Sequence, residues 1–372
     1  MLPVPLDEYP IHQTPLSLRH AGTTDRNFYD RAYFNAHDRT GETFFIAGLG
    51  VYPNLGVIDG YGTVRRGDRQ WTIRCSDALG DDRLSPTVGP FRLEVQEPLQ
   101  RIRLVCDTAE RGLGFDLTWD GSFPAVMEQH HIMRTPAGGG ARAILDASRF
   151  AQVGTWTGTM CVDGVDIAVT PDVWVGTRDR SWGVRPVGEG EPPGRPADDP
   201  TAGLWWLYVP LRFDDFAVVV IVQETPDGYR TLNDATRVWP DGRVEQLGWP
   251  EIEIAYTPGT RLPERATLHL RARDGKPLTI EVESLGYVAL HVGAGYGGDP
   301  DWGHGQWRGA GWVDSAVYDL TDPAIVPRIP FGVIDHVGRA TLDGAEGWGL
   351  FEHGTLGRHD PSGFADWDAV AT

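Results

Sequence analysis

The residues best suited to chemistry stand together in one charged segment, residues 176–185, with the sequence GTRDRSWGVR. Charged side chains are expensive to bury unless they are paired, so the segment is predicted to form a site or the ion-paired wall of one. Asp179 is its only carboxylate. In a dry interior, desolvation would raise the pKa of Asp179 and keep it protonated near neutral pH. Such an acid could donate a proton to an alkene.

In an extended segment, successive side chains point to opposite faces. If the segment is extended, Asp179 and Ser181 share one face, and Arg178, Arg180 and Trp182 share the other. An arginine within reach of Asp179 would have the opposite effect on its pKa and would hold it ionised. The alternative to a proton donor is therefore an Asp–Arg pair that ties neighbouring parts of the fold together.

The same segment resembles a family signature. Asp179, Trp182 and Gly183 match the Asp-His-x-Trp-Gly pattern of the lipocalin-like superfamily that includes carotenoid 1,2-hydratases (hydroxyneurosporene synthases), kievitone hydratases and related pericyclases, while Arg180 stands where the histidine would be. The resemblance implies a catalytic role for Asp179, with Arg180 and His131 as further candidates. Arginine does not deprotonate in proteins, so His131 is one candidate to supply the missing imidazole.

The resemblance extends beyond the signature. Residues 30–38 and 44–54 are similar to a set of uncharacterised actinobacterial and proteobacterial proteins in or near this superfamily. The resemblance implies an all-β fold of two lipocalin-like antiparallel β-barrel or sandwich domains packed together, with the signature near their junction.

The residue patterns independently favour strands. Apolar residues alternate with polar ones at 91, 93 and 95, and again at 115, 117 and 119, which is the period of a half-buried strand. Asp-Gly pairs, which suit hairpin turns, begin at positions 59, 120, 163, 227, 241, 274 and 343. Many short strands joined by tight turns are typical of a barrel or a sandwich.

A proline-rich, acidic stretch divides the chain. Residues 186–200 have no apolar anchor, which is typical of an exposed connection. We therefore predict an N-terminal β-domain over residues 1–185, a connection over 186–203 and a C-terminal β-domain over 204–372. A long loop within one larger domain is the alternative.

Composition excludes several classes of partner. The chain has 372 residues and a formal charge of −19, which argues against nucleic acid and anionic membranes as partners, since both require clustered positive charge. The N-terminus resembles no secretory signal, no apolar run is long enough to insert stably in a membrane, and the three widely spaced cysteines are typical of reduced thiols. We expect a cytoplasmic protein, and a homodimer stays open as its assembly.

Polar and aromatic residues with many glycines around them form a first candidate for substrate binding. They are Tyr52, Asn54, Asp59 and Tyr61. Glycine at this density lets the backbone approach a ligand closely, although it also suits bends at a barrel corner.

Aromatic residues in two other places could line a cavity for a planar or isoprenoid ligand. They are Trp182 and, further along, Trp302, His304 and Trp307. Indole faces stabilise cationic intermediates. The alternative is that tryptophans only plug the ends of a barrel.

Residues 127–133 are predicted to form a strand in which Glu128, His130 and Ile132 share one face and His131 lies on the other. Adjacent histidines on a strand point in opposite directions, so they do not both hold one metal ion. We predict no metal. No dinucleotide-binding, phosphate-loop or nucleophile-elbow motif occurs, and we predict no cofactor.

Two classes of function follow. The first is a cofactor-independent hydratase, dehydratase or cyclase that acts by acid catalysis on a carbon–carbon double bond of a small hydrophobic, isoprenoid-like substrate such as a terpenoid, carotenoid, steroid or prenylated compound. The second is a non-catalytic carrier of a lipophilic metabolite. They differ in whether Asp179 faces the cavity.

Overall fold

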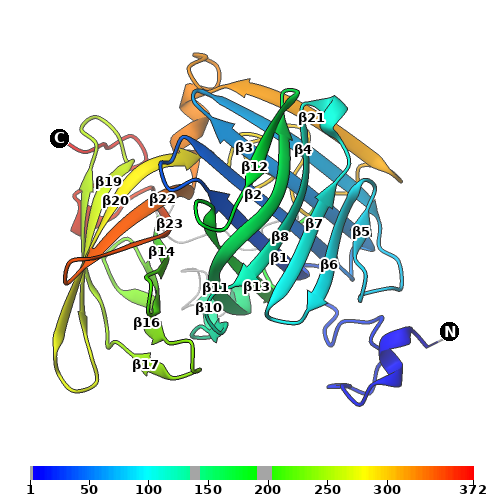
Figure 1. Ribbon diagram of the computed structural model, residues 1–372, viewed down its shortest axis with the longest axis horizontal. Helices are drawn as coiled ribbons and strands as arrows, with labels where there is room; N and C mark the ends of the chain where they lie inside the picture. Colours follow the sequence, from blue (N-terminus) through cyan, green and yellow to red (C-terminus); the bar gives the residue numbers. More distant parts are fainter. Residues whose placement is uncertain (1–2, 135–142, 191–202) are drawn as a thin grey trace.

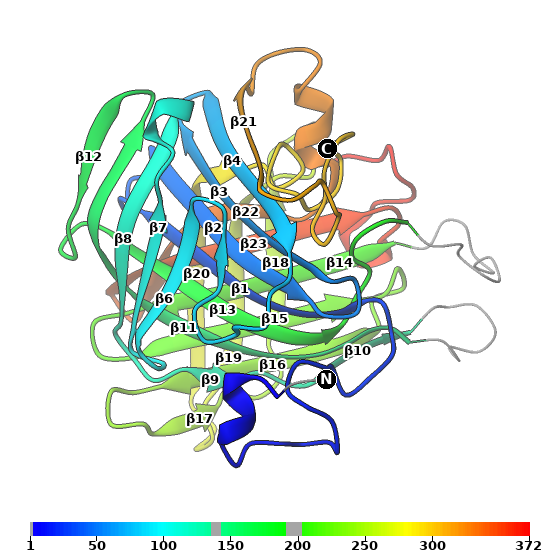
Figure 2. The same ribbon diagram turned by 90° about the vertical axis from the view of Figure 1, so that its right-hand side faces the viewer.

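The computed structural model describes residues 3–134, 143–190 and 203–372. The fold is all-β, with two curled antiparallel sheets that pack against each other, as Figures 1 and 2 show. Of the predicted connection 186–203, residues 191–202 lie outside the described residues. Four 3₁₀ turns complete the described structure: η1 (Pro5–Glu8), η2 (Ala109–Arg111), η4 (Val326–Phe331) and η5 (Asp360–Ser362).

The first sheet contains fourteen strands in the order β21-β4-β3-β2-β1-β13-β11-β8-β7-β6-β5, and β9, β10 and β12 also pair with β11. Its strands are β1 (Phe28–His37), β2 (Thr43–Tyr52), β3 (Val57–Arg66), β4 (Arg69–Ala78), β5 (Thr87–Val88), β6 (Phe91–Glu97), β7 (Arg101–Cys106), β8 (Leu113–Gly121), β9 (Val126–Met127), β10 (His131–Arg134), β11 (Ala143–Val162), β12 (Val165–Val169), β13 (Val175–Val184) and β21 (Trp312–Asp319).

The second sheet contains nine strands in the order β17-β16-β15-β14-β23-β22-β20-β19-β18. They are β14 (Leu204–Arg212), β15 (Ala217–Glu224), β16 (Arg230–Val238), β17 (Val244–Gln246), β18 (Glu251–Tyr256), β19 (Pro263–Arg271), β20 (Pro277–Val288), β22 (Ile334–Leu342) and β23 (Ala345–Leu356).

One strand crosses between the two halves of the chain. β21 comes from the predicted C-terminal range 204–372, yet it pairs with β4 at the edge of the first sheet, from Trp312 opposite Ser76 to Asp319 opposite Arg69. The edge of β4 is thereby covered. The hydrogen-bonded sheets thus do not follow a simple division of the sequence, and the predicted domain limits stay a prediction.

The Asp-Gly pairs behave in two ways. The pairs at 163, 227, 241, 274 and 343 lie in turns, as expected. Asp120-Gly121 instead ends the strand β8, and Asp59-Gly60 lies inside β3, where a Cβ on Gly60 would lie 2.3 Å from the ring of Phe91. The turn prediction was wrong there because close packing, and not a turn, requires glycine at that position.

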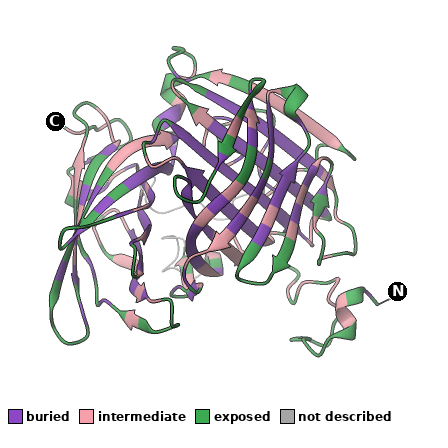
Figure 3. Ribbon diagram, in the orientation of Figure 1, coloured by how far each residue is buried: buried purple, intermediate pink, exposed green. Residues whose placement is uncertain are grey.

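Three apolar cores explain why alternation is weak in the central strands. One core fills the first sheet, one is enclosed by the strands of the curled second sheet, and one lies between the sheets. β2 is buried along its whole length, because Phe45 packs into the first core and Phe44 and Ile46 pack between the sheets. The continuous buried strands appear in Figure 3.

Gly176 lets β13 approach β1 just before Asp179. A Cβ at residue 176 would lie 2.0 Å from the backbone oxygen of Asn35, which already accepts a hydrogen bond from Nε1 of Trp156 at 2.8 Å. We therefore expect Gly176→Ala to lower the free energy of unfolding by about 3 kcal/mol. Denaturant unfolding measures the effect, with Gly80→Ala as the control, since a Cβ there meets nothing within 4 Å. Equal losses in both variants would contradict the steric explanation.

Candidate active site

Three neighbouring strands of the first sheet aim polar side chains at the second sheet. Tyr33 on β1 lies directly opposite Asp179 on β13, and Arg31 lies opposite Ser181. β11 adds Arg149, which lies opposite Ser181 on the other side of β13. Directly opposed residues present their side chains on the same face of a sheet. These five side chains therefore project together.

The second sheet also carries a row of polar and aromatic side chains, which faces the first sheet. Glu352 on β23 lies opposite Tyr208 on β14 and opposite Asp335 on β22. Trp206, two residues before Tyr208, faces the same side, and its Nε1 donates a hydrogen bond to Oε1 of Glu352. Acidic and aromatic side chains of the second sheet thus meet the charged row of the first.

A cavity of about 400 Å³ lies between these rows. Asp179 and Ser181 both line it, and Arg180 does not, so the face alternation expected for residues 176–185 is present. Asp179 therefore faces a cavity. The apolar part of the lining is formed by Leu145, Ala147, Leu204, Trp206, Leu290 and Val333.

The environment of Asp179 favours its protonated form. Desolvation is the largest cause, and the carboxylates Glu128 and Glu352 add to it, while Arg149 and the more remote Arg31 oppose it. Together they raise the pKa of Asp179 to about 7. A carboxylic acid that keeps its proton near neutral pH in a partly apolar cavity is suited to general acid catalysis.

Arg149 is committed to a different carboxylate. Its Nε donates to Oε2 of Glu128 at 2.6 Å, and its guanidinium carbon lies 4.5 Å from the ring centre of Tyr208 and 5.4 Å from that of Trp206. Burial raises the pKa of Glu128 in spite of this arginine. Because Arg149 is held by Glu128 and two rings, it acts on Asp179 only as a nearby charge.

His131 also reaches the cavity. Its ring stacks on Trp206 with centroids 6.0 Å apart, and burial, with help from Arg149, lowers its pKa to about 4, so the imidazole is neutral at pH 7. The predicted single strand over residues 127–133 was wrong, because the pairing with β11 breaks between β9 and β10. As a result Glu128 and His131 line the same cavity.

Asp335 and Glu352 form a buried acid pair beside the cavity. The hydroxyl of Tyr33 donates a hydrogen bond to Oδ2 of Asp335. Desolvation, followed by the charge of Glu352, raises the pKa of Asp335 well above its usual range, and burial raises the pKa of Glu352. Two buried carboxyls in contact share a proton, since both cannot ionise.

This pair predicts a pH-dependent stability difference for Asp335→Asn. The native state holds a proton that the unfolded chain releases above about pH 4, so the stability contribution of Asp335 is lost as the pH rises from there past neutrality. Asparagine can still accept from Tyr33 and donate to Glu352 without titrating. The variant should therefore gain stability relative to wild type as the pH rises above about 4. Urea unfolding over this rise in pH tests it, and a constant difference would contradict a shared proton.

A second cavity of about 420 Å³ adjoins the first, and both are lined by Arg31, Arg185 and Tyr296. It also contains two of the predicted binding residues, Trp302 and His304. Burial, with Arg31 as the next cause, lowers the pKa of His304 to about 4. The wall between the cavities therefore carries two arginines.

The other predicted binding residues serve various contacts. Asp59 is buried, accepts a hydrogen bond from Tyr52 at 3.1 Å and accepts the backbone N–H of Gly305 at 2.7 Å, so it supports the loop of the second cavity. Asn54 donates to the backbone oxygens of Thr23 and Asp25, both at 2.8 Å. Neither Tyr52 nor Asn54 lines the two cavities.

The three remaining predicted binding residues, Tyr61, Trp182 and Trp307, differ in how far they are buried. The hydroxyl of Tyr61 lies 2.9 Å from that of Tyr296, which places Tyr61 directly behind the cavity wall. Trp182 packs edge-on against Phe150, and Trp307 is half exposed. Neither of these two tryptophans lines the cavities.

Arg180 points away from Asp179. Its Nη2 lies 3.0 Å from Oδ1 of Asp30, and it lines a separate depression together with Arg83 and Leu49. The residue that replaces the signature histidine thus contacts a partner on the neighbouring strand β1 and does not enter the cavity of Asp179.

Sequence reasoning missed most partners of Asp179. They are Arg31, Glu128, Arg149, Asp335 and Glu352. The signal that was present is a charged residue inside a strand, as Asp335 is in the Ile334–Leu342 strand. Such a residue requires a buried partner, but its strand pattern does not say which one.

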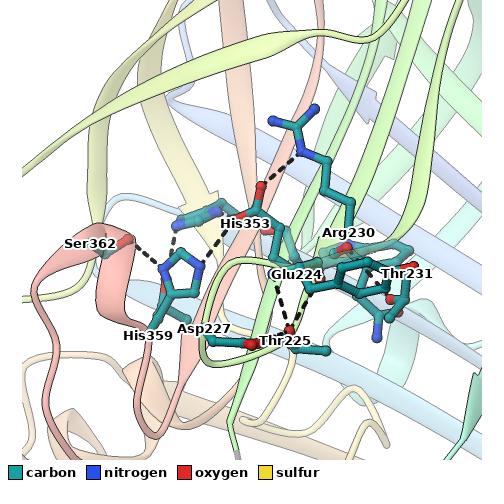
Figure 4. A network of polar contacts seen from close by, with 12 residues as sticks. Glu224, Thr225, Asp227, Arg230, Thr231, His353, His359 and Ser362 are labelled. Atoms are coloured by element: carbon teal, nitrogen blue, oxygen red, sulfur yellow. Dashed lines mark hydrogen bonds and ion pairs between the residues drawn. The ribbon is translucent and has the colours of Figure 1, made fainter.

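A second polar network lies on the side of the second sheet that is turned away from the cavity, beside the core that this curled sheet encloses (Figure 4). His359 lies between Ser362, at 2.8 Å from its Nδ1, and Glu224, at 3.1 Å from its Nε2. Arg230 donates to Glu224 at 2.9 Å, and Tyr256 lies 2.9 Å from Nε2 of His353. These contacts fasten the turn η5 to the sheet.

The described residues are 3–134, 143–190 and 203–372. In those ranges no group of three or more His, Cys, Asp or Glu side chains is placed to hold one metal ion. The same part of the chain contains no helix with the length and apolarity needed to cross a membrane.

The architecture defines a class of two-sheet, lipocalin-like proteins with a cavity between the sheets. A protein from Nitrosomonas europaea, provisionally assigned as AttH, has a similar solved structure, with 14% sequence identity, coverage of 95% of this chain and 98% of that chain, and a TM-score of 0.52. Kievitone hydratase from Nectria haematococca is similar at 13% identity over 91% of this chain and 90% of that one, with a TM-score of 0.49. The structure of CghA is similar at 12% identity over 90% and 89%, with a TM-score of 0.47.

At such identities a likeness to a solved structure shows the fold alone. The chain belongs to a family of unknown function (DUF8625), whose profile matches residues 4–365. No curated protein matches the sequence.

Proposed function

We propose that this protein is a cofactor-independent enzyme that adds water to, removes water from, or cyclises a small unsaturated hydrophobic molecule, with Asp179 as the general acid. The observation that carries the proposal is the position of Asp179 in a cavity between the sheets, where burial raises its pKa to about 7. The fold alone would equally suit a carrier, but a carrier does not need a buried acid that holds its proton.

In the hydration direction, the alkene π electrons take the proton of Asp179, and a carbon–hydrogen bond forms while the O–H bond of the acid breaks. The carboxylate left behind stabilises the carbocation. The oxygen of a water molecule then bonds to the cation, and its surplus proton passes to the neutral imidazole of His131, whose Nε2 is buried with no hydrogen-bond partner among the described residues. Return of that proton to Asp179 through solvent completes the cycle, and dehydration is the reverse.

The size of the cavity favours a compact substrate. About 400 Å³ lies near the lower end of the range of roughly 300–1,000 Å³ that is usual for ligand sites. Terpenoid or prenylated aromatic substrates suit this volume better than a full-length carotenoid. The apolar lining that includes Leu145, Leu204 and Leu290 would hold the hydrocarbon part.

The test is native mass spectrometry of the full chain after incubation with a mixed extract of terpenoids, steroids and prenylated aromatics, with analysis of both the bound species and the free pool. A gain or loss of one water, or an isomer with a shifted retention time, is the expected result. A bound compound with an unchanged pool would overturn the enzyme proposal in favour of a carrier. Heat-denatured protein controls for spontaneous reactions.

A further inference from the structure

Arg31 is a buried cation without an anion of its own. Only 7% of it is exposed, and its guanidinium carbon lies 5.1 Å from the ring centre of Tyr296. Across residues 3–134, 143–190 and 203–372, no hydrogen bond or ion pair of its side chain occurs. Arg74 and Arg178 are equally buried, yet Arg74 pairs with Asp301 and Asp314, and Arg178 donates to Gln152 at 2.7 Å. Arg31 is therefore the exception among the buried arginines of this described part.

Arg185 stands beside Arg31 in the wall shared by both cavities. Its guanidinium carbon lies 5.6 Å from the ring centre of Tyr29, and within the ranges that the structure describes it has no ion pair either. Two guanidinium groups facing one space repel each other unless an anion lies between them.

The acidic residues around both cavities have other partners, keep their protons or, in the case of Glu189, lie at the protein surface. Glu128 pairs with Arg149, and Asp299 pairs with Arg328 and accepts the backbone N–H of Gly293. Glu189 is exposed, and Asp59 is held by Tyr52 and Gly305. Asp179 and Glu352 complete the set, and burial raises the pKa of each. The two arginines thus exceed the negative charge available to them.

The second cavity also presents unpaired neutral groups. His304 is 6% exposed; its Nδ1 lies 3.6 Å from Oδ2 of Asp59, and its Nε2 has no hydrogen-bond partner in the described residues. Nε1 of Trp302, which is buried in the same wall, likewise has none there. Buried polar atoms in native proteins are normally satisfied, so these groups indicate a polar ligand in the second cavity.

We infer that the wall between the two cavities binds a carboxylate group of the substrate, with Arg31 as its main contact and Arg185 as its second. The planar fork of a guanidinium matches the two oxygens of a carboxylate. The inference deepens the proposed function and rests on it for the reacting site, and it makes the substrate an unsaturated carboxylic acid.

Such a ligand would also act on Asp179. A bound carboxylate carries the same charge as ionised Asp179, and it would neutralise the positive charge of Arg31. Both effects raise the pKa of a nearby carboxyl group. Substrate binding would therefore keep the general acid protonated at neutral pH. The hydrocarbon part of the substrate would extend from the arginines past Asp179 into the apolar end of the first cavity.

Direct binding tests the inference without any need for turnover. The probes are straight-chain carboxylic acids of about six to twelve carbon atoms, a size that a cavity of this kind admits, and the primary alcohols of the same lengths. Binding is followed by the fluorescence of Trp206 and Trp302, which line the cavities, and by the thermal shift. We expect at least one acid to bind about tenfold more tightly than its alcohol or better.

Substitutions test which arginine contacts the carboxylate group of the bound acid. Arg31→Gln should remove the preference for the acid and leave alcohol binding unchanged, and Arg185→Gln should reduce the preference. Arg339→Gln is the matched control, because Arg339 pairs with Glu283 at the surface of the second sheet, and it should keep the preference. If Arg31→Gln does not fold, Arg31→Lys and Arg185→Gln carry the test.

The inference is overturned if no acid in the series binds more tightly than its alcohol, or if the folded arginine variants keep the full preference. Failure of the proposed function looks different, since Asp179→Asn would then retain turnover while the acid preference persisted. The protein could instead convert a neutral substrate in a reaction that depends on Asp179, without any preference for acids. That result would contradict the inference and support the proposed function.

Discussion

Asp179→Asn should lower turnover by about 10²- to 10⁴-fold, the usual contribution of a general acid. Asparagine has nearly the same shape as aspartate but has no carboxyl proton to donate, so the fold and ligand affinity should be kept. Steady-state kinetics with the substrate found by mass spectrometry measure kcat and KM. Asp120→Asn is the matched control, because Asp120 is partly exposed and pairs with Arg101 across the strands β8 and β7, outside the cavity lining.

The acid role of Asp179 also predicts the direction in which kcat/KM changes with pH. Asp179 must be protonated to act, and its pKa in the free protein is about 7, so kcat/KM should be high below pH 7 and should fall as the pH rises through that value. In Asp179→Asn this limb should be absent from the residual activity. Wild-type turnover in the variant, or a rate that rises with pH through 7, would refute the acid role.

The second large effect concerns the stability of the fold. Arg149→Met should lower the free energy of unfolding by about 3–5 kcal/mol, because Glu128 would lose its buried ion-pair partner. The double variant Glu128→Gln with Arg149→Met should be more stable than the sum of the single losses predicts, since no unpaired charge remains. Urea unfolding of the full cycle measures the coupling.

A control and a second readout separate this effect from general loss of a charge. Arg101→Met removes an exposed pair with Asp120 and should cost about 1 kcal/mol or less. Arg149→Met should also move the fall of kcat/KM to higher pH, because Arg149 is the main group that lowers the pKa of Asp179. Strictly additive losses in the cycle would show that the pair does not stabilise the fold.

The sequence predicted what depends on neighbouring residues. The alternation of residues 176–185 correctly separated Asp179 from Arg180, because side-chain direction in a strand follows from position alone. The hairpin turns at 163 and 343 could also be predicted from the sequence, since Asp-Gly favours the required backbone conformation locally. The all-β class followed from the same local signals together with the family resemblance.

The rest depends on contacts between distant parts of the chain. Tyr33 and Asp335, which meet through a hydrogen bond, lie 302 residues apart, and no period or spacing connects them. Asp335 and Glu352 read as ordinary strand residues until β22 and β23 pair. The break between β9 and β10 that brings Glu128 and His131 to one cavity arises from pairing with β11, which the local sequence does not reveal.

The edge strand β21 has a consequence for synthesis of the chain. Its partner β4 ends at Ala78, whereas β21 begins at Trp312, so most of the protein must be translated before the first sheet is complete. Until then the β4 edge offers unpaired backbone groups to other chains. The N-terminal half therefore depends on the C-terminal half to cover this edge as well as to complete the wall of its cavity.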